Sequence, residues 1–171
     1  QGRAAERREV LEWNRREPPV ELSVIIPVYN VRPYLEQCIR SLTAWQAPYV
    51  EYLFVDDGST DGCDGLLEAW AAQDGRIRHI RKENGGCASA RNLGLERAVG
   101  NYVGFVDGDD FVDKEMFRRL LQRAMMGRYE MAYCGFSEYH EGEQRTVAVR
   151  GECMQEPYLS GTRAAEEVQR L

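Results

Sequence analysis

The chain has 171 residues, which is enough for one compact domain with a sizeable core. Lys and Arg total 22 against 28 Asp and Glu, and this acidic balance argues against general binding to nucleic acid or anionic membranes, since both need surplus positive charge. No apolar run approaches the roughly 20 residues of a membrane helix, and the first residues show no secretory signal.

Strand-like and helix-like segments alternate from Leu22 onward. Short apolar or β-branched runs predict strands at residues 22–28, 49–55, 77–80 and 102–106. Apolar residues at three- and four-residue spacing predict helices at 33–45, 66–70 and 116–124, and small residues predict another at 88–98. Two further strands are expected at 131–139 and 146–149, around a hairpin turn at 140–143. This order predicts an α/β fold, with a Rossmann-like, mainly parallel sheet and helices on both faces.

The two ends of the chain differ from this central part. Residues 1–19 are charge-balanced and helix-like, and Pro18 and Pro19 end the segment, which we interpret as a helical leader or arm. We expect one domain over residues 20–160 and the start of another helix over residues 161–171.

Polar residues follow three of the predicted strands, where ligands bind in open α/β sheets. The first strand ends in Pro-Val-Tyr-Asn, the second in Asp-Asp-Gly-Ser and the fourth in Asp-Gly-Asp-Asp. Crowded carboxylates repel one another, and a divalent cation such as Mg²⁺ or Mn²⁺ would compensate them. Asp107 and Asp109 therefore predict a metal that holds a diphosphate. A solvated acidic turn is the alternative, because Asp and Gly are common turn residues.

Several familiar signatures are missing from the sequence. It contains no G-x-x-x-x-G-K-[ST] and no G-x-G-x-x-G, which argues against a P-loop NTPase and a dinucleotide-binding domain. Its five Cys residues include no C-x-x-C, so no structural zinc site is expected. Their odd number indicates reduced thiols, most of them small core residues.

Four segments, SVIIPVYN, VDDGSTDG, ENGGCASARNLGL and YVGFVDGDD, occur in this order within about residues 22–125. Together they resemble the family 2 glycosyltransferases of the GT-A fold, and four motifs in register are far more specific than any one of them. The resemblance implies that residues 20–160 form the nucleotide-sugar-binding half of such an enzyme. The helix at 161–171 would then lead to an acceptor-binding region that this chain lacks.

The resemblance also implies roles for individual residues. Positions matching the family's nucleotide-sugar-binding elements are Pro27, Tyr29, Asn30, Asp57, Asn84, Gly85, Arg91, Asp107 and Gly108, and those matching its metal ligands are Asp109 and Asp107. Tyr29 would stack on uracil, and Asp57 would accept a hydrogen bond from the uracil N–H. Asp56 would instead brace its turn. Ordinary packing of Tyr29 and a helix-surface position for Arg91 stay open as alternatives.

The implied activity is metal-dependent, inverting transfer of a hexosyl-type sugar from a UDP-type nucleotide sugar to a hydroxyl group, with Mn²⁺ or Mg²⁺ as cofactor. The expected partners are the nucleotide-diphosphate sugar and a carbohydrate or lipid-linked acceptor of the cell-surface polysaccharide or glycolipid type. We expect a cytoplasmic protein, and leave open its oligomeric state and its association with the inner face of the membrane. Glu166 and Glu167 do not resemble the family's general base, so no catalytic base is assigned.

Three other functions compete with this one. A fragment that binds a nucleotide sugar without transferring it remains an alternative. A nucleotidyltransferase is another, although residues 29–33 lack its usual Gly- and Lys/Arg-rich triphosphate loop. A phospho-acceptor receiver domain is disfavoured, because it needs acids after its first strand and a Lys after its fifth.

Overall fold

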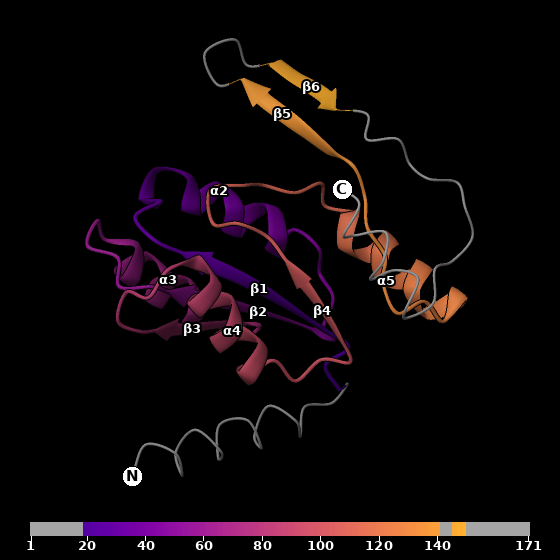
Figure 1. Cartoon of the computed structure of the whole chain (residues 1–171), viewed down its shortest axis with the longest axis horizontal. Coiled ribbons are helices and arrows are strands. Elements are labelled where there is room, and N and C mark those ends of the chain that lie inside the picture. Colours follow the sequence, from indigo (N-terminus) through magenta and orange to yellow (C-terminus); the bar gives the residue numbers. More distant parts are fainter. Residues whose placement is uncertain (1–18, 141–144, 150–171) are drawn as a thin grey trace. The chain divides into compact units, whose positions relative to one another are not determined.

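A computed structural model describes residues 19–140 and 145–149 of the chain (Figure 1). The expected helix at 161–171, Cys153 and nearly all of the expected arm at 1–19 lie outside these residues. The chain divides into two compact units, one ending at Glu115 and the other beginning at Met116.

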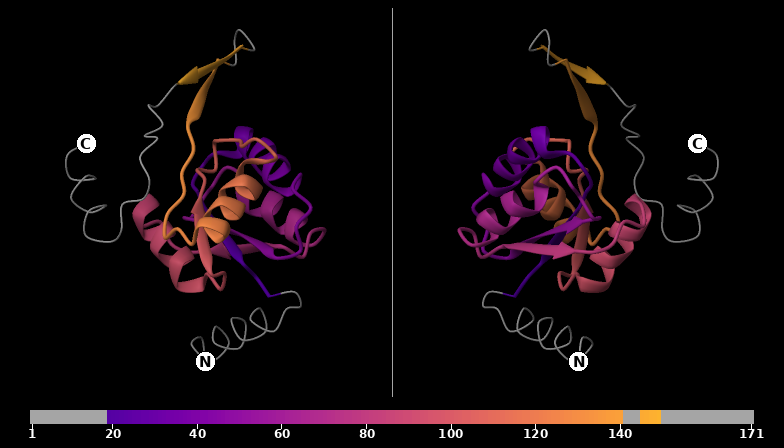
Figure 2. Two further views of the ribbon diagram at one scale, coloured as in Figure 1. Left: turned by 90° about the vertical axis from the view of Figure 1, so that its right-hand side faces the viewer. Right: turned by 90° about the vertical axis from the view of Figure 1, so that its left-hand side faces the viewer.

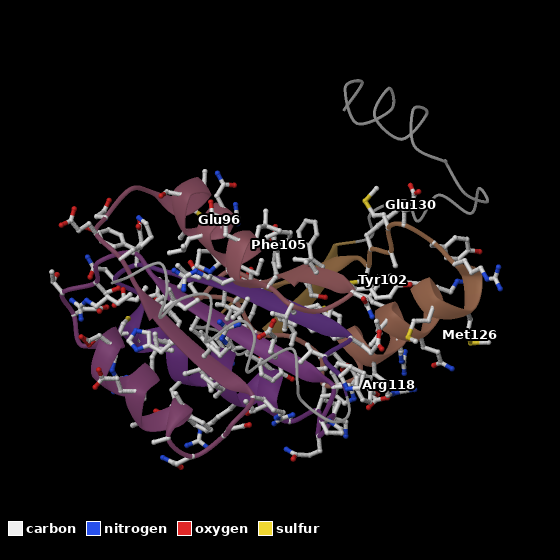
Figure 3. All side chains as sticks on the ribbon, turned by 90° about the horizontal axis from the view of Figure 1, so that it is seen from below. Glu96, Tyr102, Phe105, Arg118, Met126 and Glu130 are labelled. Carbon is white, nitrogen blue, oxygen red and sulfur yellow. The ribbon has the colours of Figure 1, made fainter. Side chains whose placement is uncertain are left out.

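The first unit contains a four-stranded parallel sheet with the order β3-β2-β1-β4. The strands are β1 (Leu22–Val28), β2 (Val50–Asp56), β3 (Ile77–Arg81) and β4 (Tyr102–Phe105), and the connecting helices are α2 (Arg32–Thr43), α3 (Cys63–Ala71) and α4 (Cys87–Arg97). The chain runs outward from β1 to β3, and α4 then carries it back to β4 on the other side of β1. Because parallel crossovers are right-handed, this reversal places α4 on the sheet face opposite α2 and α3 (Figures 2 and 3). The predicted fold class is confirmed.

The core lies around the two central strands. All seven residues of β1 and all seven of β2 are buried, which explains why their sequences are nearly continuous apolar runs. Helix α4 packs on β1 so closely that a Cβ at Gly94 would lie 2.4 Å from Ile25 Cγ2. This close approach explains why the buried positions of α4 are the small residues Ala90 and Gly94.

A buried polar network ties the start of β4 to the rest of the sheet. The Glu51 carboxylate accepts hydrogen bonds from Ser23 Oγ (2.5 Å), Arg78 Nη1 (2.9 Å) and the Val99 backbone N–H (2.9 Å). Arg78 also donates to the carbonyl of Arg97, the last residue of α4. Because Glu51 and Arg78 are almost fully buried, each is a charge that depends on the other for compensation.

The second unit contains helix α5 (Met116–Gly127) and an antiparallel hairpin of β5 (Phe136–His140) and β6 (Arg145–Val149). The hairpin confirms the prediction of two paired strands. The expected strand at 131–139 began too early, because β5 begins at Phe136 and residues 131–135 pair with no strand among the described residues. His140 pairs with Arg145 and lies in β5, not in the turn.

Two smaller expectations also need correction. Helix α2 ends at Thr43, so Trp45 lies beyond it and packs edge-on against Tyr49. Among the four described cysteines, all free thiols, Cys38 and Cys63 are buried as expected, whereas Cys87 and Cys134 are exposed. None of the helices in the described ranges combines the length and apolar character needed to cross a bilayer.

Candidate functional site

The segments that follow β1, β2 and β4 begin side by side at one edge of the sheet. The Asp57 N–H donates to the Val28 carbonyl (2.8 Å), and the Val106 N–H donates to the Ile25 carbonyl (3.2 Å), so the pairing continues past the ends of β2 and β4. The sheet order reverses between β1 and β4, which is where open α/β sheets bind ligands. The motif residues therefore start from the expected ligand-binding edge.

The turn after β2 is braced internally and tied to the turn after β1. Asp56 is fully buried, and its Oδ1 accepts the Ser59 N–H at 2.8 Å, which is the bracing role expected for it. Ser59 Oγ in turn accepts the Asn30 N–H, and Asn30 Oδ1 accepts the Thr60 N–H at 2.9 Å. Asn30 has a φ of 52°, a left-handed conformation that Asn tolerates better than most residues. The structure thus gives Asn30 a turn-linking role that the sequence did not predict.

Asp61 holds the first turns of two helices. Its Oδ2 accepts the Arg32 N–H at 2.8 Å and its Oδ1 accepts the Cys63 N–H at 3.2 Å, at the starts of α2 and α3. Partial burial alone would raise its pKa, but these bonds hold the pKa of Asp61 below its usual value. A protein carboxylate thus accepts one N–H at each of these helix ends, where an anion would otherwise be favoured.

Asp57 anchors the segment between β3 and α4. Its Oδ1 accepts the Lys82 ammonium at 2.5 Å and the Gly85 N–H at 3.0 Å, and its Oδ2 accepts the Gly86 N–H at 2.7 Å. Burial alone would raise the pKa of Asp57, but the bonds from Lys82, Gly85 and Gly86 outweigh burial and hold the pKa below its usual value. Asn84, an exposed residue, lies between Lys82 and Gly85 in the same segment.

Sequence reasoning did not identify Lys82 as part of this site. A signal was present, because Lys82 directly follows β3 and therefore lies at the same edge of the sheet as Asp57. The segment between β3 and α4 also approaches the turn after β2 closely, since a Cβ at Gly58 would lie 3.1 Å from the backbone nitrogen of Asn84. Gly58 has a φ of +79°, so a side chain there would be strained as well as crowded.

The acidic turn, residues 107–110, follows β4. It is closed by a bond of 3.0 Å from the Asp110 N–H to the Asp107 carbonyl. Gly108 is buried, and a Cβ there would lie 3.0 Å from the Pro27 carbonyl oxygen, so the predicted residues Pro27 and Gly108 pack against each other. Arg91 of α4 donates to Asp107 Oδ1 at 2.5 Å, so Pro27 and Arg91 lie beside the turn that contains Asp107 and Gly108, while Asp109 is exposed.

The electrostatics of the acidic turn suit a small hard cation. Partial burial, followed by the nearby carboxylates of Asp109 and Asp107, raises the pKa of Asp110. Within the described residues, no three His, Cys, Asp or Glu side chains are grouped so as to hold a metal ion by themselves. Mg²⁺ needs only one or two carboxylates when phosphates and water complete its coordination, so the oxygen donors of this turn fit such an ion.

Two further side chains of this region are Tyr29, which follows β1, and Cys38 of α2. Tyr29 is 51% exposed, so ordinary packing does not account for its ring. Cys38 of α2 lies beneath the acidic turn, where burial and the carboxylates of Asp110, Asp109 and Asp107 raise the pKa of its thiol to about 12. The thiol therefore stays protonated and keeps its capacity to donate.

The chain is similar to known proteins over most of its length. Residues 23–166 match the family model described as Glycosyl transferase family 2. It is 42% identical over 128 residues to the uncharacterized glycosyltransferase EpsJ of Bacillus subtilis, covering 75% of this chain and 37% of the relative. It is 39% identical over 117 residues to the putative teichuronic acid biosynthesis glycosyltransferase TuaG of the same organism, covering 68% of this chain and 46% of the relative.

Solved structures are also similar to this chain. Residues 1–349 of S. aureus TarS in complex with UDP-GlcNAc match with a TM-score of 0.60 and 26% identity, over 71% of this chain and 39% of that chain. A Pyrobaculum calidifontis mannosyltransferase has a TM-score of 0.57 at 23% identity, which shows a shared fold. The chain spans less than half the length of each of these relatives. Because the family model matches most of the chain, the protein belongs to glycosyl transferase family 2.

Proposed function

We propose that this chain is the donor-binding part of an inverting glycosyltransferase, which moves a hexosyl-type sugar from a UDP-type nucleotide sugar to a hydroxyl acceptor. The observation that carries the proposal is the meeting of the Asp57 anchor, the Arg91–Asp107 pair and the acidic turn at one edge of the sheet. A TarS structure contains UDP-GlcNAc, and the name of TuaG refers to teichuronic acid biosynthesis. These relatives support a UDP-sugar donor and an acceptor of the cell-surface polysaccharide or glycolipid type.

The nucleobase would be held between the turn after β1 and the segment that Asp57 anchors, between β3 and α4. The exposed ring of Tyr29 offers a π-face, and stacking on a base contributes about 1–3 kcal/mol. Asp57 Oδ2 accepts one hydrogen bond within the described residues, from Gly86, and so keeps a lone pair for an N–H of the base. A base without that N–H would leave this capacity unused, which favours uracil over cytosine.

The diphosphate would lie at the acidic turn. Asp109, with Asp107, would hold Mn²⁺ or Mg²⁺, which as a Lewis acid stabilises negative charge on the leaving diphosphate. Arg91 fixes Asp107 through its Nη2, and its buried Nε has no hydrogen-bond partner within the described part of the chain. The acceptor hydroxyl needs a general base, and we place that group in the acceptor half that the relatives' greater length provides.

Nucleotide binding by the 171-residue chain tests this proposal. We expect UDP with Mn²⁺ to raise the melting temperature more than CDP or GDP with Mn²⁺. A bound ligand stabilises the folded state by mass action, by about 2.7 kcal/mol at a hundredfold excess over Kd. Calorimetry should show tighter UDP binding with Mn²⁺ than without it. Equal responses to UDP and CDP would contradict the proposed recognition of uracil. Single-turnover transfer from UDP-sugars to an acceptor panel, by a protein that also contains the acceptor half, separates a transferase from a domain that only binds UDP.

A further inference from the structure

Two side chains of α2 hold the backbone of the segment that contains the acidic turn. Cys38 donates its thiol to the Asp107 carbonyl, with a sulfur–oxygen distance of 3.8 Å. Ser41 Oγ accepts the Val112 N–H at 3.1 Å and donates to the Cys38 carbonyl at 2.8 Å. The segment is thus held at both ends by residues that lie about one turn apart on a single helix.

The acidic turn needs support from outside itself. Residues 106–113 form neither helix nor strand, and a backbone hydrogen bond from Asp110 to Asp107 closes the turn. Asp107, Asp109 and Asp110 carry like charges within four residues, and their repulsion favours an opened turn when no cation is bound. Arg91 restrains the side chain of Asp107, but its contact does not reach the backbone beyond Asp110.

The two contacts on α2 are placed to supply that support. Cys38 is fully buried, and the Asp107 carbonyl that it contacts also accepts the Asp110 N–H, so one oxygen joins the helix to the closure of the turn. Ser41 is half-buried, and its hydroxyl links the backbone of α2 to that of the segment through one donated and one accepted bond. Neither residue belongs to the set that would touch the donor or the metal.

We infer that Cys38 and Ser41 are positioning residues, which hold the acidic turn in the shape that presents Asp109 to the metal and the diphosphate. This inference rests on the proposed function, and it adds that α2 sets the metal-dependent part of donor affinity. Holding a site in its bound geometry lowers the cost of binding, because the turn need not be ordered when the ligand arrives.

The test compares UDP affinity with and without Mn²⁺ by calorimetry in wild type, Ser41→Ala, Ser41→Thr and Cys38→Ala. Without Mn²⁺, we expect Ser41→Ala to bind UDP as tightly as wild type does. With Mn²⁺, its increase in UDP affinity should be about tenfold smaller than that of wild type. Ser41→Thr keeps the hydroxyl and should restore most of that gain. Thr43→Val is the matched control, because the Thr43 hydroxyl bonds to the Ile39 carbonyl within α2 and should leave the Mn²⁺ gain unchanged.

The outcomes separate the inference from the proposed function. If wild type gains UDP affinity from Mn²⁺ and Ser41→Ala keeps the whole gain, the positioning role is wrong while the proposed function stands. A Ser41→Ala variant that melts earlier but keeps the Mn²⁺ gain overturns the positioning role as well, since that is what a purely structural role predicts. If wild type gains nothing from Mn²⁺, the metal site of the proposed function fails, and the inference fails with it. Cys38→Ala removes a buried group, so the half-buried variant Ser41→Ala decides the question if Cys38→Ala does not fold.

Discussion

Lys82 places its ammonium nitrogen 2.5 Å from Asp57 Oδ1, across 25 residues of sequence, and so closes the segment after β3 onto the end of β2. The Asp57 side chain is 3% exposed and the Lys82 side chain 20%, so the pair is largely shielded from water. The same carboxylate binds the N–H groups of Gly85 and Gly86. One acid therefore shapes a segment that sequence motifs alone assign to donor binding.

Replacing Lys82 should weaken this anchor without abolishing it. Lys82→Met leaves Asp57 with its two backbone N–H bonds but removes the neighbouring cation, and we expect the free energy of unfolding to fall by about 1–3 kcal/mol. Urea denaturation measures this change. Lys82→Arg keeps the charge and should lose less, and a Lys82→Met variant as stable as wild type would show that the pair contributes nothing.

The pH dependence of stability should report the same anchor. The folded-state pKa of Asp57 lies below its usual 3.8, so its charge stabilises the fold above about pH 4, and that stabilisation is lost as the pH falls through the folded pKa. Asp110, whose pKa is raised, has the opposite sign and gains stability on acidification. In urea titrations from pH 6 to pH 2, we expect Asp57→Asn to flatten the acid loss. An unchanged slope would exclude Asp57 as its source.

Asp109→Asn should remove most of the joint effect of UDP and Mn²⁺ on the melting temperature while the fold persists, because a hard cation with few protein ligands depends on each carboxylate. Without ligand, the variant should be as stable as wild type or slightly more stable, since one repelling charge is gone. Asp113→Asn, which removes an exposed acid beyond the acidic turn, is the control. If both variants keep the joint effect, Asp109 is not a metal ligand and the acidic turn is a solvated loop.

Glu51 and Arg78 form a buried ion pair near the beginnings of β2 and β3. The motif residues follow the opposite ends of the strands. Arg78→Met leaves the buried Glu51 uncompensated and should cost about 3–5 kcal/mol of folding free energy. The double variant Glu51→Gln with Arg78→Met should recover a large part of that loss. Denaturation of the single and double variants forms a double-mutant cycle, and additive losses would mean that the two residues do not depend on each other.

Local sequence pattern was sufficient for the regular elements of the first unit. Strand β1 was predicted with the bounds that the structure shows, because a strand buried on both faces must be apolar at successive positions. The strand expected at residues 131–139 begins later than its composition predicts. A β-rich composition allows an extended chain, but a strand also needs a partner, and the described pairing of β5 with β6 begins at Phe136 and Val149.

The order of strands and helices in the first unit and the motif residues at its strand ends could be predicted from local periodicity and spacing. The partners of those residues could not, because they depend on how the elements pack. Asp57 meets Lys82 across 25 residues, Arg32 meets Asp61 across 29, and Cys38 meets Asp107 across 69. A carboxylate or carbonyl is satisfied by whatever donor the crossovers bring to the same sheet edge, and that juxtaposition depends on strand order and helix packing, not on spacing along the chain.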